Sequence, residues 1–484
     1  MTGNLHDYNA PVALSSSASP RSLERRLGPV DAAAVVIANV IGVGIFITPA
    51  LIAETIPNPL SILGVWVFGG LLAFAGAMAY AELAALRPRS GGEYVYLREA
   101  FGPFAAFLTG WTSFVAGFAG AIAAAALTVP LYLGTFVPAA NDATPKLSLA
   151  LGPLSLVFSN QSIVALVAIF GLALIHIRGL GPGRLVQNTL AGLKVGALAL
   201  FVAIGLGWGH GTMANLASGP ASHSTNFALA MLLVMFTYSG WNAASYVAEE
   251  IRDPGRNVPI ALGLGTGVVV VLYLGINLLY LYALPVDAVL KGAAAGQTPN
   301  LNVAALVLLG PSAERLLGAL AIVILLSSLS AMTLAGPRVY FAMARDGVFF
   351  RSAGRVHPRY HTPWLAILTQ AVWSGLLVLT NTRDQLAQYT GFAVLLFSGF
   401  AVAALFVLRR RRPDEPRPFR AWGYPLAPAL FIIASLGISA MAVAGRPRQA
   451  AWGLVVMALG VPLYVWMKWR HPAGDPESRE APRA

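Results

Sequence analysis

The chain has 484 residues, of which 57% are hydrophobic and only 11% are charged. Since about a quarter of the residues of a soluble globular protein are charged, this composition excludes a soluble protein. The net charge of +12 would suit a nucleic-acid-binding protein, but the positions of the arginines favour another explanation. No cysteine is present, which excludes disulfides, thiolate nucleophiles and cysteine metal ligands.

Apolar stretches of about twenty residues recur along the chain, and each can cross a hydrocarbon core of about 30 Å. Twelve of them start near residues 30, 61, 103, 161, 186, 226, 259, 313, 363, 385, 424 and 449. We therefore predict an all-α polytopic membrane protein with twelve transmembrane helices. The polar ends, residues 1–27 and 469–484, are predicted to be disordered tails, and the first lacks the apolar core of a signal peptide.

Basic residues are distributed asymmetrically if the spans alternate from a cytoplasmic N-terminus. The cytoplasmic side then holds Arg21, Arg25, Arg26, Arg87, Arg89, Arg98, Arg178, Arg184, Arg252, Arg256, Arg345, Arg351, Arg355, Arg359, Arg409, Arg410, Arg411, Arg412, Arg417 and Arg420. The outer side holds Lys146, Lys291, Arg315, Arg383, Arg446 and Arg448. This asymmetry follows the positive-inside rule. It predicts a cell (inner, cytoplasmic) membrane protein with both termini cytoplasmic and no nucleic-acid partner.

Two spans contain a stretch that disfavours a continuous helix. Residues 39–49, NVIGVGIFITP, set Gly42 and Gly44 among β-branched residues in the first span. Residues 236–242, FTYSGWN, set Ser239 beside a glycine in the sixth span. Both stretches have low helix propensity, so we predict that both helices are broken.

The two breaks occupy matching positions of successive five-span units, residues 28–210 and 220–412. Because five is odd, the second unit crosses the membrane in the opposite sense. Two further helices follow within residues 413–468. A glycine pair in one membrane helix mostly serves close packing, but matched breaks in inverted repeats indicate the binding site of a transporter.

A broken helix offers charge-selective groups to a ligand. Amides at the start of a half-helix favour an anion, and carbonyls at the end of another favour a cation. An α-amino acid carries one charge of each sign on either side of a single carbon. The sequence therefore predicts an amino-acid site whose carboxylate lies at the first break.

Longer motifs carry a family resemblance. VIGVGIF in the first span is similar to the G-S/T-G-I-F signature of the amino acid–polyamine–organocation (APC) superfamily. Segments between about residues 28 and 465 resemble its L-type amino-acid transporter (LAT-like) branch, prokaryotic type. They are AYAELAALRPRSGGEYVYLREAFGPFAAFLTGW, HIRGLGPGRLVQNTLAGLKVGALAL, FTYSGWNAASYVAEEIRDPGRNVPIAL, GPRVYFAMARDG and LRRRRPDEPRPFRAWGYP. The resemblance implies a LeuT-type five-plus-five inverted repeat with broken helices 1 and 6.

The resemblance also implies which residues contact the substrate. They are Ile41, Gly42, Val43, Gly44, Phe236, Thr237, Ser239 and Asn242. The amides of Gly42, Val43 and Gly44 would meet the carboxylate, and the carbonyls around Phe236, Thr237 and Ser239 would accept from the amino group. Phe236 would also gate the pocket, and Asn242 would brace it. Val43 stands where the family usually has Ser or Thr, and Ser239 where it usually has Gly, which favours small or medium neutral substrates.

Lys194 lies in the middle of the fifth span, where a lysine costs at least about 2.5 to 3.5 kcal/mol and needs a protein partner. The resemblance implies that its ammonium replaces the sodium ion that related transporters bind between the first break and the eighth span. Ser328 would be its partner there, with Ser327 and Ser330 as alternatives. A permanently charged lysine predicts an exchanger, whereas one that loses its proton in each cycle predicts proton-coupled uptake.

The remaining polar residues carry no visible catalytic chemistry. Glu82, at the inner end of the second span, is predicted to act as a cap or to pair with loop arginines such as Arg87. Glu249 and Glu250 are predicted to form an interfacial charge cluster with the arginines that follow them, Arg252 and Arg256. No catalytic triad, zinc motif or phosphate loop occurs, so we expect no enzyme activity, cofactor or metal.

Two function classes remain. The first is a sodium-independent secondary transporter of neutral L-amino acids, by exchange or by proton coupling. The second is an amino-acid sensor or scaffold that retains the fold without turnover. Residues 135–160 hold no cysteine, so we expect no disulfide-linked heavy chain. The oligomeric state is left open.

Overall fold

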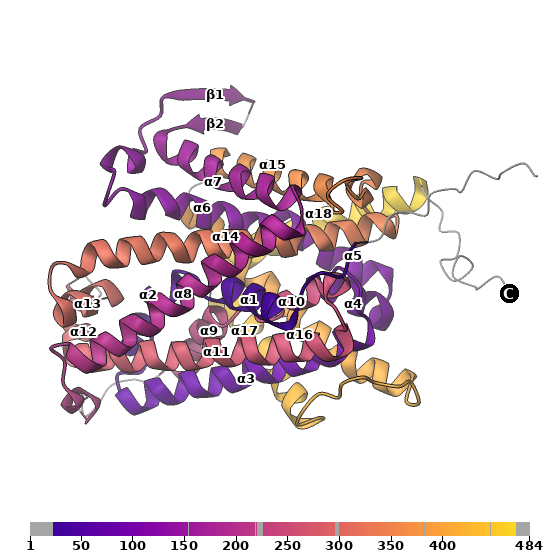
Figure 1. Ribbon diagram of the computed structural model, residues 1–484. Coiled ribbons are helices and arrows are strands. Elements are labelled where there is room, and N and C mark those ends of the chain that lie inside the picture. The colour runs from indigo at the N-terminus through magenta and orange to yellow at the C-terminus, as the bar shows by residue number, and fades with distance from the viewer. Residues whose placement is uncertain are drawn as a thin grey trace, which may run out of the picture.

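The computed structural model describes residues 23–152, 154–217, 219, 226–295, 300–380, 383–445 and 447–470. The described chain is a bundle of long helices with one small hairpin at its edge (Figure 1). Of the tails predicted for residues 1–27 and 469–484, residues 1–22 and 471–484 lie outside the described residues.

The α-helices follow in chain order. They are α1 (Pro29–Val40), α2 (Gly44–Thr55), α3 (Pro59–Leu86), α4 (Glu93–Phe101), α5 (Pro103–Thr112), α6 (Phe118–Leu133), α7 (Asn160–Ile177), α8 (Leu180–Trp208), α9 (Phe227–Thr237), α10 (Ala243–Tyr246), α11 (Pro254–Ala283), α12 (Val286–Ala294), α13 (Leu301–Leu309), α14 (Ala313–Arg345), α15 (Trp364–Thr380), α16 (Arg383–Arg411), α17 (Leu426–Gly445) and α18 (Pro447–Arg470). The short elements are η1 (Ser113–Gly117), η2 (Pro138–Asn141), η3 (Met213–Ala217), η4 (Ala248–Glu250), η5 (Arg351–Gly354), β1 (Leu147–Leu151) and β2 (Leu154–Phe158).

Local sequence explains where several helices begin. Proline stands in the first turn of α1, α3, α5 and α11, where its missing N–H is not needed and its fixed φ already suits a helix. The Asn58 side chain caps α3 by accepting from the amide of Ser61 at 2.9 Å. Similarly, Ser159 and Ser162 cap the start of α7 reciprocally.

Six described helices are long and apolar enough to cross a membrane, and the bent pair α1 and α2 adds a seventh candidate. One of the six runs through α5, the π-helical turn η1 and α6 as a single stretch, Pro103–Leu133. The chain is therefore a polytopic helical membrane protein. Every predicted span start lies near the start of a described helix.

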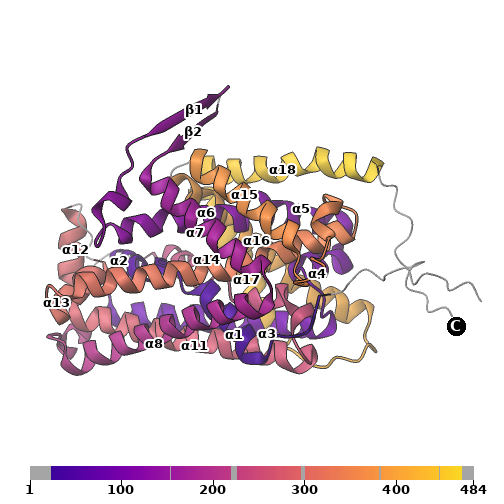
Figure 2. The same cartoon turned by 45° about the horizontal axis from the view of Figure 1, so that its top comes forward.

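Helix α1 lies inside the bundle, packed against α8, α11 and α14 (Figures 1 and 2). Its residues from Ala32 to Ala38 are all buried. α11 also packs along α3, and α14 packs along α6. The first break at the end of α1 is thus enclosed by helices from distant parts of the chain.

Two features differ from the sequence prediction. The loop between α6 and α7 contains the antiparallel hairpin of β1 and β2, so the protein is not strictly all-α. Residues 23–27, assigned to the tail, contact the body: Leu23 and Leu27 are buried, and Leu27 pairs with Ile251.

The predicted pairing of Glu82 with loop arginines is confirmed for Arg417, but Arg87, the example given for it, is wrong. Buried Glu82 instead forms ion pairs with Arg409 at 2.5 Å and Arg417 at 3.1 Å, while Arg87 pairs with Glu99 at 2.7 Å and with Glu415. The sequence could not anticipate Arg409, Arg417 and Glu415 as partners, because they come from the far end of the chain.

The predicted cluster of Glu249 and Glu250 with the arginines that follow them is wrong as well. Glu250 forms a fully buried pair with Arg338 of α14 at 2.8 Å. Glu249 pairs with Arg345 at 3.0 Å. Both carboxylates therefore connect η4 to α14.

Candidate functional site

The first break separates two half-helices of equal length. α1 and α2 have 12 residues each, or about 18 Å, and their axes are bent by 51°. Residues 41–43 join them, so the break lies near the middle of the pair. Within the described chain, the amides of Gly42 and Val43 donate to no hydrogen bond. This leaves backbone donors at the start of α2, where the helix dipole favours an anion.

The space beside this break is open. A Cβ atom added to Gly42 or Gly44 would meet no atom within 4 Å. Gly44 is exposed and Gly42 half-buried, although Ile41 before them is fully buried. The glycines are therefore not required for close helix packing here, and they leave the backbone accessible to a ligand.

The second break lies between α9 and α10 and touches the first half-helix. Gly240 has a φ of 101°, a conformation that side chains rarely adopt. A Cβ there would lie 2.6 Å from Nδ2 of Asn39, and that amide group donates to the Gly240 carbonyl at 3.1 Å. Asn39 of α1 thereby links the two breaks.

Phe236 and Ser239 form the exposed side of the second break. The Phe236 side chain is 46% exposed. Its carbonyl accepts from the Ser239 amide at 3.1 Å and from the Ser239 hydroxyl at 2.7 Å. Both lone pairs of this carbonyl are therefore engaged by protein donors.

Thr237 and Tyr273 connect the ends of the broken helices. The Tyr273 hydroxyl of α11 lies 3.1 Å from the Val40 carbonyl and 3.3 Å from the Thr237 carbonyl. The Thr237 hydroxyl donates to Thr48 of α2 at 3.0 Å. Neither Tyr273 nor Thr48 could be predicted from the sequence, since their hydrogen bonds depend on contacts between helices.

Lys194 of α8 reaches the carbonyl end of α1. It is fully buried, and its Nζ atom lies 3.0 Å from the Ala38 carbonyl, 2.6 Å from the Ile41 carbonyl and 3.1 Å from Oγ of Ser328. The Ser328 hydroxyl in turn lies 3.0 Å from the Ile41 carbonyl. Three acceptors around a three-donor group satisfy an ammonium completely.

The alternatives to Ser328 have other surroundings. The Ser330 hydroxyl lies 2.9 Å from Nε2 of His176, and the buried Ser327 hydroxyl has no partner in the described part of the chain. The structure thus brings together Lys194, Ser328 and the first break, and leaves the other two serines outside this contact.

Asn242 contacts a buried carboxylate, Glu93, that was not among the predicted site residues. Its Nδ2 atom donates to Oε2 of Glu93 at 2.9 Å, and the hydroxyls of Tyr246 and Tyr80 donate to the same atom at 2.8 and 3.1 Å. Burial raises the pKa of the Glu93 carboxyl, which lies in α4 outside the spans. One sequence feature could have pointed to Glu93: it is an acidic residue directly after two glycines, in a segment with an apolar face, SGGEYVYL.

A larger hollow lies away from both breaks. A groove of about 1060 Å³ runs along α3, α11 and residues 418–422. Its walls are mostly apolar and include no residue of either break. Among the described residues, no group of three metal-ligating side chains occurs either. The polar groups that could orient a zwitterion lie at the breaks.

An interrupted helix inside a membrane-spanning bundle, with free amides facing open space, defines the class of a secondary membrane transporter. Comparison with known proteins specifies the family. The model of the amino acid permease family matches residues 27–466, so the chain belongs to that family. The resemblance to the APC superfamily and its LAT-like branch is confirmed.

Several characterised relatives align along nearly the whole chain. The serine/threonine exchanger SteT of Bacillus subtilis is 28% identical over 450 residues, covering 93% of this chain and 98% of its own length. The human large neutral amino acids transporter small subunit 2 is 28% identical over 497 residues, covering 95% and 85%. The human cystine/glutamate transporter is 27% identical over 464 residues, covering 92% and 86%.

Proposed function

We propose that this protein is a sodium-independent exchanger of neutral L-amino acids in the cytoplasmic membrane. Its family membership supports amino-acid transport, and the names of two relatives, a serine/threonine exchanger and a cystine/glutamate transporter, show that substrates vary within the family. The mechanism and the selectivity must therefore be argued from this chain's own residues.

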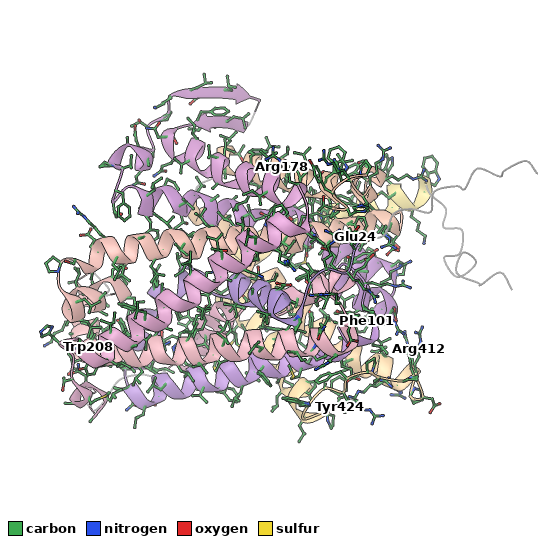
Figure 3. All side chains as sticks on the ribbon, viewed as in Figure 1. Glu24, Phe101, Arg178, Trp208, Arg412 and Tyr424 are labelled. Carbon is green, nitrogen blue, oxygen red and sulfur yellow. The ribbon has the colours of Figure 1, made fainter. Side chains whose placement is uncertain are left out.

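The proposed topology has twelve spans in two inverted units. Spans 1 to 5 are α1 with α2, α3, α5 with α6, α7 and α8. Spans 6 to 10 are α9 with α10, α11, α14, α15 and α16, and α17 and α18 follow. Glu24, Phe101 and Arg412 lie toward one end of the bundle and Trp208 lies at the other (Figure 3). The arginine asymmetry assigns the first end to the cytoplasm.

The proposed substrate lies between the breaks with its carboxylate at Gly42, Val43 and Gly44. Support comes from the free amides and from the open space beside both glycines. The amino group would take the place of the Ser239 hydroxyl at the Phe236 carbonyl, which requires a rotation of that side chain. Thr237, Asn242 and Ile41 would hold the surrounding backbone.

The contacts of Lys194 are the observation that carries sodium independence. Its ammonium contacts two backbone carbonyls and one hydroxyl, which are the kinds of oxygen ligand that also bind metal cations. The side chain thereby connects α8, the first break and α14. A covalently attached charge cannot dissociate during the cycle. Since all three N–H donors are satisfied, the lysine acts as a permanent link, which favours exchange over proton-coupled uptake.

Selectivity for neutral substrates follows from charge balance. Burying an unpaired charge is costly, and Glu93 is the buried carboxylate nearest to the second break. Its Oε2 atom already accepts three hydrogen bonds, with Asn242 as one donor. Glu93 is thus occupied by protein donors, and cationic amino acids and polyamines are disfavoured. Val43 and Ser239 favour small or medium side chains.

Counterflow into proteoliposomes tests the proposal. Purified protein alone, without a second subunit, should exchange external alanine, serine or leucine for internal substrate at the same rate in sodium and in choline. The rate should not respond to a pH gradient, and arginine should not compete. Uptake into empty vesicles driven by a pH gradient would instead indicate a proton-coupled permease, and substrate binding without exchange would indicate a sensor.

A further inference from the structure

A small basic pocket lies at the end of the bundle opposite to Trp208. It has a volume of about 290 Å³ and is lined by Arg25, Arg26, Leu180, Gly181, Arg184 and Arg252. Glu24 and Arg178, the chain neighbours of this lining, lie toward the same end (Figure 3). The positive-inside rule explains why arginines occur on this side, but it does not explain why four of them converge on one hollow.

The charge of the pocket is only partly balanced. Arg26 pairs with Glu24 at 2.5 Å, and Arg184 lies 3.6 Å from Asp31. Arg25 and Arg252 have no acidic partner within the described chain. Four guanidinium groups against two carboxylates leave an excess of two positive charges, whose mutual repulsion an anion would relieve.

The start of α8 adds backbone donors to the same hollow. Its first amides have no acceptor within the helix, no side chain caps them, and the first turn holds no acidic residue. A Cβ added to Gly181 would meet no atom within 4 Å, so the backbone there is accessible. A helix start favours negative charge, and arginine pairs with phosphate in a bidentate manner.

The size of the pocket limits the ligand. Sites for drug-sized molecules have about 300 to 1,000 Å³, so this pocket suits a single small group. Basic pockets between helices on the cytoplasmic side of membrane proteins bind anionic headgroups. From the convergent arginines and the open helix start, we propose that this pocket binds a phosphate group, carried by an anionic phospholipid or by a free phosphate.

The pocket's position gives such binding a consequence. The N-terminal segment, residues 23–28, is held to the end of the sixth span: the amides of Arg26 and Leu27 both donate to the Glu250 carbonyl at 2.9 Å. Across the pocket, α8 reaches this region through Asn188, whose side chain donates to Asp31 at 2.6 Å. A phosphate contacting Arg25, Arg252 and the start of α8 would fasten these elements together.

Alternating access requires such elements to separate on the cytoplasmic side. The bound phosphate therefore slows opening toward the cytoplasm, a consequence that rests on the proposed transport function. Binding itself does not rest on it, so the two can fail separately.

The test compares the double variant Arg25→Gln/Arg252→Gln with wild type and with Arg256→Gln. Arg256 is a matched control: it is exposed, lies one helical turn after Arg252, has no described ion-pair partner and does not line this pocket. The full-length protein is placed in nanodiscs of phosphatidylcholine. Thermal unfolding is measured with sodium phosphate against sodium chloride at equal ionic strength, and again in nanodiscs that contain phosphatidylglycerol.

Wild type and Arg256→Gln should unfold at a higher temperature with sodium phosphate or with phosphatidylglycerol, whichever carries the bound phosphate group. The double variant should bind that ligand at least about tenfold more weakly. A shift with phosphatidylglycerol alone identifies a lipid headgroup, and a shift with phosphate alone identifies a free anion. The proposal would be overturned if the unfolding temperature of the double variant rose as much as that of wild type. It would also be overturned if chloride raised the unfolding temperature of wild type as much as phosphate does.

Exchange rates in the same two lipid mixtures test the consequence. The anionic partner should slow exchange by wild type and leave the double variant unaffected. An anion that binds without changing the rate would contradict the fastening role. Absence of exchange in every sample would count against the proposed function, while the unfolding data would still decide on binding.

Discussion

At the scale of single residues, Lys194 shows how a buried polar side chain is satisfied by groups from several helices. Its three acceptors come from the end of α1 and from α14. The Lys194 side chain therefore connects three elements, α1, α8 and α14. If the side chain were truncated, the Ala38 and Ile41 carbonyls would lose their charged donor, at a cost of about 1 to 3 kcal/mol for each buried group.

Lys194→Ala should therefore reduce exchange by at least about tenfold, while the protein still reaches the membrane because the helices keep their apolar faces. The measurement is counterflow per molecule of protein in the membrane. Lys291→Ala, at an exposed position of α12, serves as the control and should leave the rate unchanged. A fully active Lys194→Ala variant, or sodium-dependent exchange by wild type, would contradict the assignment.

The protonation of the Glu93 carboxyl gives a second prediction at this scale, because it makes the stability of the protein depend on pH. Burial raises the pKa of this carboxyl above the ordinary value of 4.5. Between that value and the raised one, the folded protein keeps a proton that the unfolded chain has released. The free energy of unfolding therefore falls as pH rises through this window.

Glu93→Gln should flatten this dependence, because the amide has no proton to lose. Thermal unfolding in detergent, followed from about pH 4.5 upward, measures the slope for wild type and variant. The control is Glu314→Gln, since Glu314 is exposed at the start of α14. Equal slopes for wild type and Glu93→Gln would show that Glu93 does not titrate in this range.

At the scale of elements, the glycines of the two breaks serve different purposes. A Cβ at Gly44 meets open space, whereas a Cβ at Gly240 would collide with Asn39 and would require a left-handed backbone. The first glycine thus leaves room for a ligand, and the second is needed to build the turn between α9 and α10.

Gly44→Ala should leave the unfolding temperature unchanged or higher, since alanine favours helix formation. The methyl group should block the approach of the carboxylate and raise KM for exchange by about tenfold or more. Gly240→Ala should instead lower the unfolding temperature, because the left-handed conformation costs about 1 to 2 kcal/mol before the clash is counted. An unchanged KM for Gly44→Ala would show that the substrate carboxylate binds elsewhere.

At the scale of the whole molecule, distant ion pairs hold one end of the bundle together. Glu82 of α3 contacts Arg409 of α16 and Arg417 beyond it. Glu250 of η4 contacts Arg338 of α14 in a fully buried pair. Arg409 and Arg417, two of the arginines on which the predicted orientation rests, thus also have structural partners.

The orientation of the chain in the membrane can be tested by labelling single introduced cysteines, because the chain itself contains no cysteine. A cysteine at Asp414 should resist an impermeant thiol reagent applied to intact cells, and a cysteine at Lys146 should react with it. Both positions are exposed, so a difference reports the side of the membrane. Reaction of the cysteine at position 414 from outside would refute the cytoplasmic placement of this loop.

The sequence by itself determined the helices and their class. Apolar length fixes where a span starts, and proline or a capping residue fixes its first turn, because these are local properties. The glycine pair at Gly42 and Gly44 marked the first break for the same reason. Motifs along the chain identified the family, and the position of Lys194 in an apolar segment required a partner whatever the fold.

The tertiary structure alone decided the partners of the buried charges and the shape of the site. Sequence proximity suggested Arg87 as a possible ion-pair partner of Glu82. In the assembled bundle, Glu82 instead pairs with Arg409, which is 327 residues away in the chain. Asn39, Tyr273 and Glu93 gained their contacts with the breaks in the same way, through helices that meet only when the bundle is assembled. A buried polar group must be satisfied by whatever donor or acceptor the packing places beside it, and that neighbour is not encoded at any local position in the chain.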